Sequence, residues 1–392
     1  MDTSRNDSAD RLRVVVLGAG FGGLELTTRL SEEVGDRVDV VLVDRTDSFV
    51  FGFSKLDVMF GRSMPREVQH RYADVTHPGV RFVHAEVIAI DAPHRRVATT
   101  AGSFDADVLV VALGADLEPA ATPGLVEDGH EFYTEAGAFA LRETIAAFPG
   151  GRVVVGVTST PFKCPPAPSE AALLVDEHLR RAGLRERSEV TLVLPLPSPV
   201  PPSPAASEAL LAAFAERDIR FLSGRSARSL DPARHVAVLD DGSELPYDLF
   251  LGVPLHRVPE VVARSGLATH GWIAVDPVTL ETRWPGVYAV GDVTSAGTPK
   301  AGVFAEGQAT AVAEAVIARL RGESSPAGYG GHGTCYVEFG DDRVGVVDVT
   351  FRSGEAPSGF LEGPSVELAA DKGEFGTARV RRWFGQDWSP HG

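Results

Sequence analysis

The chain of 392 residues contains only two cysteines, and these are its strongest candidates for chemistry. Cys164 lies in the segment 162–170, which carries three prolines, and Cys335 follows 171 positions later. No Cys or His spacing is that of a zinc site, so no metal site is expected. Two cysteines can instead alternate between a disulfide and a dithiol, which carries two electrons. The sequence therefore predicts a redox pair, with two buried, inert cysteines as the alternative.

The net charge of −17 restricts the partners of the chain. Nucleic-acid binding is not expected, because phosphates are bound by clustered basic side chains. No apolar run reaches the roughly 18 residues needed to span a bilayer, and residues 1–10 are polar, without the apolar stretch of a signal peptide. We therefore expect a cytoplasmic protein that could still touch the cytoplasmic face of a membrane. A permanent structural disulfide is disfavoured in that compartment.

A dinucleotide-binding pattern opens the chain. Residues 12–17 are an apolar, β-branched run typical of a buried parallel strand, and a Gly-x-Gly-x-x-Gly turn leads from it into a helical pattern. In this turn Gly18 permits a sharp bend, Gly20 lets the backbone approach a pyrophosphate, and Gly23 lets the helix pack closely on the strand. Phe21 lies inside the same turn and is included in the predicted cofactor site.

Three later segments indicate which dinucleotide is bound. A second predicted strand, residues 38–43, ends at Asp44, an acid placed to bind a ribose hydroxyl. An apolar strand over 107–113 ends at Gly114, and far downstream a short strand leads to Asp292. The order of these segments along the chain resembles that of the two-dinucleotide-fold flavoproteins. The resemblance implies FAD as the cofactor, with Asp292 on its ribityl chain.

The second glycine fingerprint of NAD(P)H-using members of that superfamily is missing. The corresponding strand, residues 152–155, continues through Gly156 to Pro161 with one glycine where three would be needed. Pro161 also has no N–H to offer a phosphate. NAD(P)H is therefore not the expected electron donor, and thiol or sulfide chemistry is the expected source of electrons.

The segment around Cys164 resembles the middle-domain cysteine motif of sulfide:quinone oxidoreductases and of the flavoprotein subunit of flavocytochrome c sulfide dehydrogenase. Similar strings occur along most of the chain, at 130–134, 252–257, 271–276, 299–306, 334–336 and 382–385. The resemblance implies an α/β fold with two Rossmann-like dinucleotide-binding-type domains and a small C-terminal domain. It also implies an enzyme that oxidises sulfide to persulfide or polysulfide through Cys164 and Cys335 and passes electrons through FAD to a quinone.

Two departures from these families affect the assignment. The third cysteine of many quinone-reducing members is absent, and residues 49–55 lack the cysteine that holds the flavin in the flavocytochrome branch. FAD is therefore expected to be noncovalent. Two classes of electron acceptor remain as alternatives, a quinone and a cytochrome or other protein. Two substrates also remain as alternatives, sulfide and a small thiol. A type II NADH dehydrogenase and a flavin-bound redox sensor without turnover are the remaining alternatives.

Four further residues are candidates for proton transfer or for stabilising the reduced flavin. Glu170, near the start of a predicted helix, could take a proton from sulfide or a thiol if burial raises its pKa, or serve only as a helix-start acid. His130 is a candidate proton relay for quinone reduction, or a solvated loop histidine. Lys300 could stabilise the negative charge of reduced flavin, or lie on the surface. His256 is a weaker candidate.

The predicted domain organisation is discontinuous. Residues 11–115 and 265–322 form the FAD-binding domain. Residues 116–264 insert between them as a second Rossmann-like domain that carries Cys164. Residues 323–392 form a C-terminal region that carries Cys335.

The tail between Phe375 and Trp388 interleaves arginine with aromatic side chains. This composition suits packing on the flavin domain, the interpretation we prefer, and it also suits peripheral contact with a membrane interface. A homo-oligomer is an option that the sequence leaves open.

Overall fold

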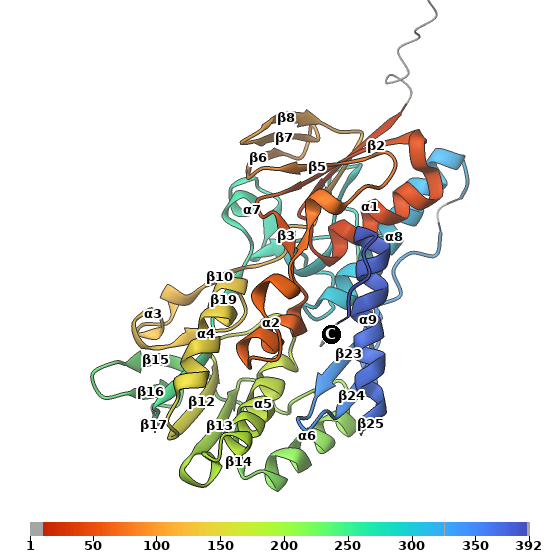
Figure 1. Cartoon of the computed structure of the whole chain (residues 1–392). Helices are drawn as coiled ribbons and strands as arrows, with labels where there is room; N and C mark the ends of the chain where they lie inside the picture. The colour runs from red at the N-terminus through yellow and green to blue at the C-terminus, as the bar shows by residue number, and fades with distance from the viewer. Residues whose placement is uncertain (1–10, 325, 390–392) are drawn as a thin grey trace, which may run out of the picture.

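The computed structural model describes residues 11–324 and 326–389 of the chain. The polar segment 1–10 lies outside these residues. Two five-stranded parallel sheets and a three-stranded antiparallel sheet form the frame of the molecule, with helices between and around them (Figure 1). The predicted α/β class with two Rossmann-like units is confirmed.

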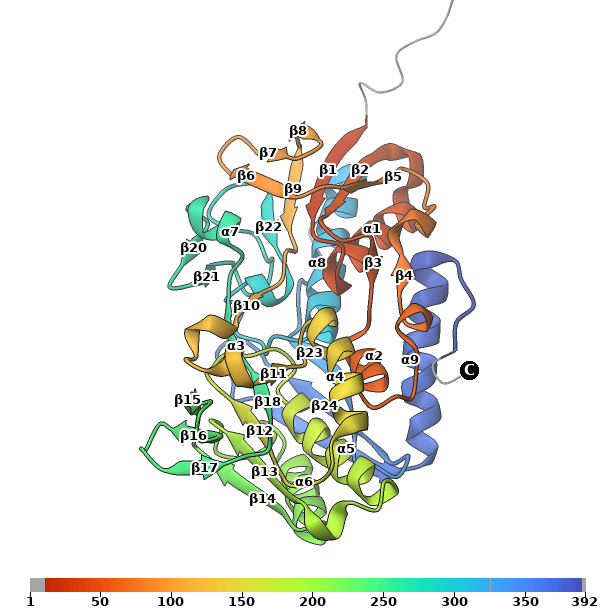
Figure 2. The same ribbon diagram turned by 60° about the vertical axis from the view of Figure 1, so that its left-hand side comes forward.

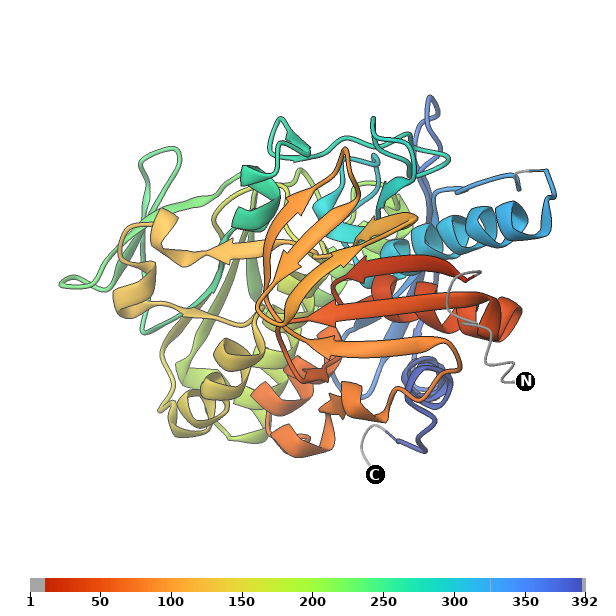
Figure 3. The same ribbon diagram turned by 90° about the horizontal axis from the view of Figure 1, so that it is seen from above.

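The first parallel sheet carries the glycine-rich turn. Its strands, in order across the sheet, are β22 (Val287–Ala289), β9 (Val108–Val111), β1 (Leu12–Leu17), β2 (Val38–Asp44) and β5 (Val80–His84). Val14 and Val16 of β1 face a core shared with α1 (Phe21–Val34) and α8 (Gly302–Arg321). Val15 and Leu17 face the opposite core, under an antiparallel sheet of β6 (Val87–Asp91), β7 (Arg96–Thr99) and β8 (Gly102–Asp105) (Figure 3). Burial on both faces explains why β1 and β2 are continuous apolar runs.

The second parallel sheet carries the first cysteine. Its strands, in order, are β11 (His130–Glu131), β18 (Leu249–Val253), β12 (Arg152–Val157), β13 (Glu189–Leu194) and β14 (Ile219–Ser223). The helices of this half are α4 (Glu135–Ala147), α5 (Ala167–Arg181) and α6 (Pro204–Glu216). They share one core with the sheet. The other face is covered by an antiparallel sheet of β15 (Ala227–Asp231), β16 (Val236–Leu239) and β17 (Glu244–Pro246).

The C-terminal region is an antiparallel sheet followed by a long helix. The sheet consists of β23 (His332–Glu338), β24 (Val344–Thr350) and β25 (Ser358–Ser365), and the helix is α9 (Glu367–Phe384). β23 contacts both α5 and α8, so it bridges the two parallel-sheet halves. α9 runs along the side of the molecule to α1 (Figure 2).

The aromatic tail packs inward rather than outward. Trp383 and Phe384 are buried in the core beneath α1 and α8, and the indole N–H of Trp388 donates to the Glu67 carbonyl at 2.8 Å. The preferred interpretation of the tail as a packing element therefore agrees with its position. Over residues 11–324 and 326–389, no helix combines the length and the apolar character that a bilayer crossing requires.

Short elements complete the fold. They are α2 (Gly52–Met59), α3 (Leu125–Asp128), α7 (Glu260–Arg264), β3 (Ser48–Phe49), β4 (His70–Arg71), β10 (Asp116–Glu118), β19 (Leu255–Arg257), β20 (Ala268–Thr269) and β21 (Trp272–Ile273). Of these, α2 matters most for the site, because it lies against α4 and links the two parallel-sheet halves.

Candidate functional site

The glycine turn has the geometry that its sequence predicts. Gly18 has a φ of +101°, and a Cβ added there would lie 2.3 Å from the Ala112 carbonyl oxygen. A Cβ at Gly23 would lie 1.9 Å from the Gly18 carbonyl oxygen, so this glycine allows the helix to meet the strand. A Cβ at Gly20 would meet nothing within 4 Å. Gly20 therefore leaves open space at the N-terminus of α1, where a phosphate could approach the backbone.

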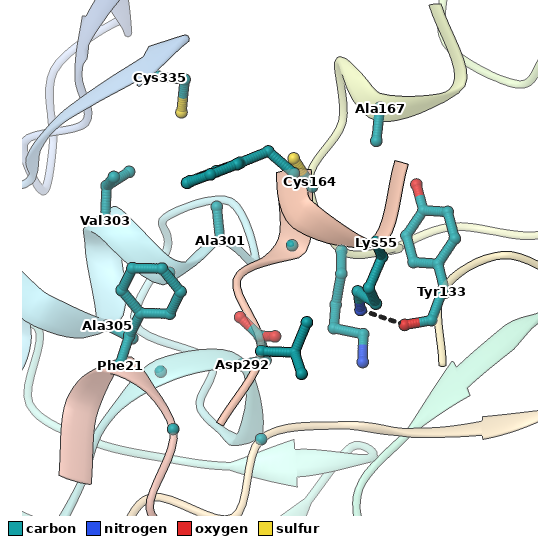
Figure 4. A pocket seen from close by; sticks show the side chains of 18 of the residues that line it. Phe21, Lys55, Tyr133, Cys164, Ala167, Asp292, Ala301, Val303, Ala305 and Cys335 are labelled. Carbon is teal, nitrogen blue, oxygen red and sulfur yellow. Dashed lines mark hydrogen bonds between the residues drawn. The ribbon is translucent and has the colours of Figure 1, made fainter. Parts of the chain in front are cut away.

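A cavity of about 320 Å³ opens where the strand ends of the two halves meet the C-terminal sheet. Seven of the predicted site residues line it: Gly20, Phe21, Gly114, Cys164, Glu170, Asp292 and Cys335. The structure thus brings the glycine turn and both cysteines, which the chain separates by 171 positions, to one cavity. Figure 4 shows both sulfur atoms directed into it.

The two cysteines reach the cavity from different elements. Cys164 lies between β12 and α5 and has a φ of +49°, a left-handed conformation that is uncommon for a residue with a Cβ. Its N–H donates to the Lys300 carbonyl at 2.7 Å, and its own carbonyl accepts from the Ala167 N–H at 2.8 Å. Cys335 lies in the middle of β23, paired with Val347 of β24. Both are free thiols in this structure.

Glu170 lies close to both thiols. The side chain is 4% exposed, and its Oε1 accepts from the Glu338 N–H of β23 at 2.9 Å. Burial raises the pKa of Glu170 to about 7. Burial, followed by the charge of Glu170, raises the pKa of Cys335 to about 12 and raises that of Cys164 as well. Both thiols are therefore neutral near pH 7 and need a proton acceptor before they can act as thiolates.

All four lysines of the chain lie in or around this cavity, although the chain has 37 basic residues. Lys55 and Lys163 line the cavity. The ammonium group of Lys55 donates to the Tyr133 carbonyl, and burial together with Lys163 lowers its pKa to about 8. Lys300 and Lys372 are each 7% exposed. Lysine suits such sites because its pKa shifts readily on burial, whereas arginine stays charged.

Six candidate residues do not line the cavity. One of them is His256, which is 3% exposed and whose Nδ1 lies 2.8 Å from the Pro254 carbonyl oxygen. Gly18 and Gly23 lie behind the cavity and shape the turn. The Asp44 carboxylate accepts from the Ala19 N–H at 2.7 Å and so ties β2 to the glycine turn. His130 is half-buried in β11, where burial lowers its pKa. Lys300 donates to the carbonyls of Asp292 and Thr294, its ammonium lies 3.2 Å from the centre of the Trp272 ring, and burial lowers its pKa to about 8.

Sequence reasoning missed several groups that line the cavity. Lys55, Lys163 and Tyr133 are the most notable. The Tyr133 hydroxyl is buried and, among the described residues, has no hydrogen-bond partner. Lys163 directly precedes Cys164, and Tyr133 lies in the segment 130–134, where only His130 was predicted to take part in the chemistry. The scarcity of lysine in the chain was the signal that could have found Lys55 and Lys163.

Comparison with known proteins identifies the family. Residues 12–315 match the family model described as pyridine nucleotide-disulphide oxidoreductase. The chain belongs to this family. It is 24% identical over 346 residues to the mitochondrial sulfide:quinone oxidoreductase of Mus musculus, covering 84% of this chain and 76% of that protein. It is 34% identical over 118 residues to a type II NADH:quinone oxidoreductase of Staphylococcus saprophyticus, covering 30% of this chain and 29% of that protein.

The fold agrees with these sequence similarities. The structure of the sulfide:quinone oxidoreductase from Aquifex aeolicus superposes with a TM-score of 0.82 at 20% identity, covering 95% of this chain and 92% of that one. The resemblance stated from the sequence is therefore confirmed, and the chain is an oxidoreductase of this family.

FAD is the cofactor of this family, and the cavity fits it. The open space at Gly20 and the N-terminus of α1 suit a pyrophosphate. Gly114 and Asp292 follow the ends of β9 and β22 and line the same cavity. Burial raises the pKa of the Asp292 carboxyl, while Lys163, Lys300 and Lys55 counteract this effect.

Proposed function

We propose that this protein is a sulfide:quinone oxidoreductase-type enzyme that oxidises sulfide through Cys164 and Cys335 and delivers two electrons to a quinone. One observation carries the proposal: both cysteines, the buried Glu170 and Gly20 of the glycine turn line the same cavity. The similarity to sulfide:quinone oxidoreductases over 84% of the chain supports the same substrate pair.

The sulfur chemistry follows from thiol–disulfide exchange. In the oxidised pair, HS⁻ attacks one sulfur of the Cys164–Cys335 disulfide; the S–S bond breaks, one cysteine becomes a persulfide and the other a thiolate. Over the whole reaction, HS⁻ loses one proton and two electrons, and its sulfur leaves bound to another sulfur. Bound FAD would supply a two-electron relay between the sulfur site and the quinone. The quinone takes up two electrons and two protons to become a quinol.

Glu170 is the proposed proton acceptor of the sulfur half-reaction. Its pKa of about 7 lets it exist in both forms near neutral pH, which a base that must also release its proton requires. When Glu170 takes a proton from a thiol or from the persulfide, the negative charge moves from carboxylate to sulfur. The net charge of the buried site stays constant, so the transfer avoids the cost of adding a buried charge.

The apolar part of the cavity supports a quinone as the acceptor. Phe53, Tyr336 and Phe375 line it, and they come from α2, β23 and α9. Flat aromatic walls suit a flat, lipid-soluble ring. Peripheral contact with a membrane and a cytoplasmic location remain predictions that go with this acceptor.

Anaerobic stopped-flow absorbance tests the proposal. We expect sulfide to bleach the flavin of the purified yellow protein, and a soluble quinone to restore its colour. Cys164→Ser and Cys335→Ser should both lose bleaching by sulfide while they keep the flavin. Bleaching that survives in both variants, or no bleaching of the wild type, would refute the proposal.

A second candidate is NADH:quinone oxidoreduction, which the 34% identity to the staphylococcal enzyme over 118 residues favours. Gly156, at the end of β12, does not have the spacious surroundings of Gly20, because a Cβ there would lie 2.4 Å from the Phe250 ring. Addition of NADH in the same experiment separates the two functions. If NADH bleaches the flavin and sulfide does not, the second candidate holds. A cytochrome as the acceptor would show as rapid cytochrome reduction without quinone.

A further inference from the structure

An ion cluster of one partly buried and three buried side chains lies next to Glu170. It consists of Asp57, Arg62, Glu338 and Lys372, which come from α2, the loop after α2, β23 and α9. Arg62 donates to both carboxylate oxygens of Glu338, at 2.6 and 3.1 Å, and lies 2.8 Å from Asp57. Lys372 donates to Glu338 as well. Asp57 is 2% exposed, and Glu338 and Lys372 are each 7% exposed.

The cluster reaches Glu170 through β23. Glu338 offers its side chain to Arg62 and Lys372 and its backbone N–H to the Glu170 carboxylate, at 2.9 Å. The same strand carries Cys335 three residues earlier. Because the side chain of Glu338 is fixed by two cations, the N–H that holds Glu170 and the strand that holds Cys335 are fixed together.

The charges of the ion cluster balance without Glu170. Arg62 and Lys372 supply two positive charges, and Asp57 and Glu338 supply two negative ones. Despite burial, which has the opposite effect, Lys372 and Arg62 hold the pKa of Glu338 well below its ordinary value. An ionised Glu170 is therefore the uncompensated charge of this group, whereas a protonated Glu170 leaves the group neutral.

We propose that the ion cluster is a positioning device that holds Glu170 near the two thiols and sets how readily Glu170 gives up its proton, so that the C-terminal helix controls the sulfur site. This inference rests on the proposed role of Glu170 as the proton acceptor. The groups that face Glu170 are Lys372 of α9, Glu338 and Cys335 of β23, Arg62, Cys164 and the Tyr133 hydroxyl.

The charges of the ion cluster make opposite predictions for two substitutions. Lys372→Met removes a positive charge that favours ionised Glu170, so the protonation midpoint of Glu170 should rise by about one pH unit. Glu338→Gln removes a negative charge that opposes ionisation and keeps the backbone N–H, so the midpoint should fall by about the same amount. The double variant should return close to the wild type. A purely structural role for the ion cluster would not produce shifts of opposite sign.

Infrared difference spectroscopy of the purified flavoprotein measures this midpoint directly. The carboxylic acid band that disappears in Glu170→Gln identifies Glu170, and its intensity is followed against pH in each variant. This readout does not use sulfide. A protein that sulfide fails to bleach would refute the proposed function, while the infrared titration would still test the ion cluster.

Opposite shifts in the two single variants support the proposal. Shifts in the same direction, or no shift in folded proteins, overturn it. If the single variants do not fold, the double variant carries the test: a midpoint within a few tenths of the wild type supports the compensation of charges, and a displacement of about one pH unit overturns it.

Discussion

Replacing Glu170 by glutamine should stabilise the protein at alkaline pH relative to acidic pH. Burial raises the pKa of this carboxyl from 4.5 to about 7. Between these values the folded protein binds a proton that the unfolded chain does not, so the contribution of Glu170 to stability is complete below pH 4.5 and is lost as the pH rises through 7. The interval of about 2.5 pH units corresponds to about 3 kcal/mol. Glutamine stays neutral at every pH and its amide oxygen can still accept from the Glu338 N–H, so the variant avoids this loss.

Urea unfolding of wild type and Glu170→Gln at about pH 4.5 and about pH 8 measures this difference. The variant should gain about 3 kcal/mol in free energy of unfolding relative to wild type between the two conditions. Glu208→Gln, which removes an exposed carboxylate from α6, is the matched control. The reasoning fails if wild type and Glu170→Gln respond equally to pH, because Glu170 would then be ionised in the folded protein without cost. The same variant should lose flavin bleaching by sulfide, since its side chain cannot accept a proton.

Gly23→Ala should prevent accumulation of folded, yellow protein, because its Cβ would lie 1.9 Å from the Gly18 carbonyl oxygen. Gly20→Ala should fold, because a Cβ there meets no atom within 4 Å, and it should bind FAD more weakly. Equal expression and equal flavin content of the two variants would contradict this prediction. Trp383→Ala should lower the free energy of unfolding by about 3 to 5 kcal/mol, because the indole is fully buried and donates to Glu25. A loss below about 1 kcal/mol, measured by urea unfolding, would be inconsistent with this burial. Lys55→Met should lower the two-electron potential of the flavin, since it removes a positive charge from the cavity; an unchanged potential in spectroelectrochemical titration would exclude this role.

The sequence predicted the parts of the fold that depend on local pattern. β1 and β2 have almost the predicted bounds, because a parallel strand that is buried on both faces consists of a continuous run of apolar residues. α5 begins at Ala167, three residues before Glu170, because a proline such as Pro168 is tolerated in the first turn of a helix, where no N–H is needed.

The sequence predicted the site residues that lie in recognisable motifs. It did not predict those that only tertiary packing brings to the site. The glycines and both cysteines lie in recognisable strings. The position of Lys300 depends on carbonyl oxygens of its own loop, which no pattern specifies, and its flavin role stays a prediction. The pairing of Arg62 with Glu338 joins residues 276 positions apart through side chains that also occur on any solvated surface. Only the folded chain shows that Glu338 is buried and Arg62 partly buried in this pair.

The position of Cys335 in β23 has a consequence for biosynthesis. The strand begins at residue 332, after both parallel sheets have already been translated. While the ribosome still holds the last part of the chain, Cys164 has no second thiol beside it and the cavity lacks the wall that β23 and α9 provide. The proposed cysteine pair therefore forms only after both parallel sheets have been translated, and termination before residue 332 would leave Cys164 without its proposed partner.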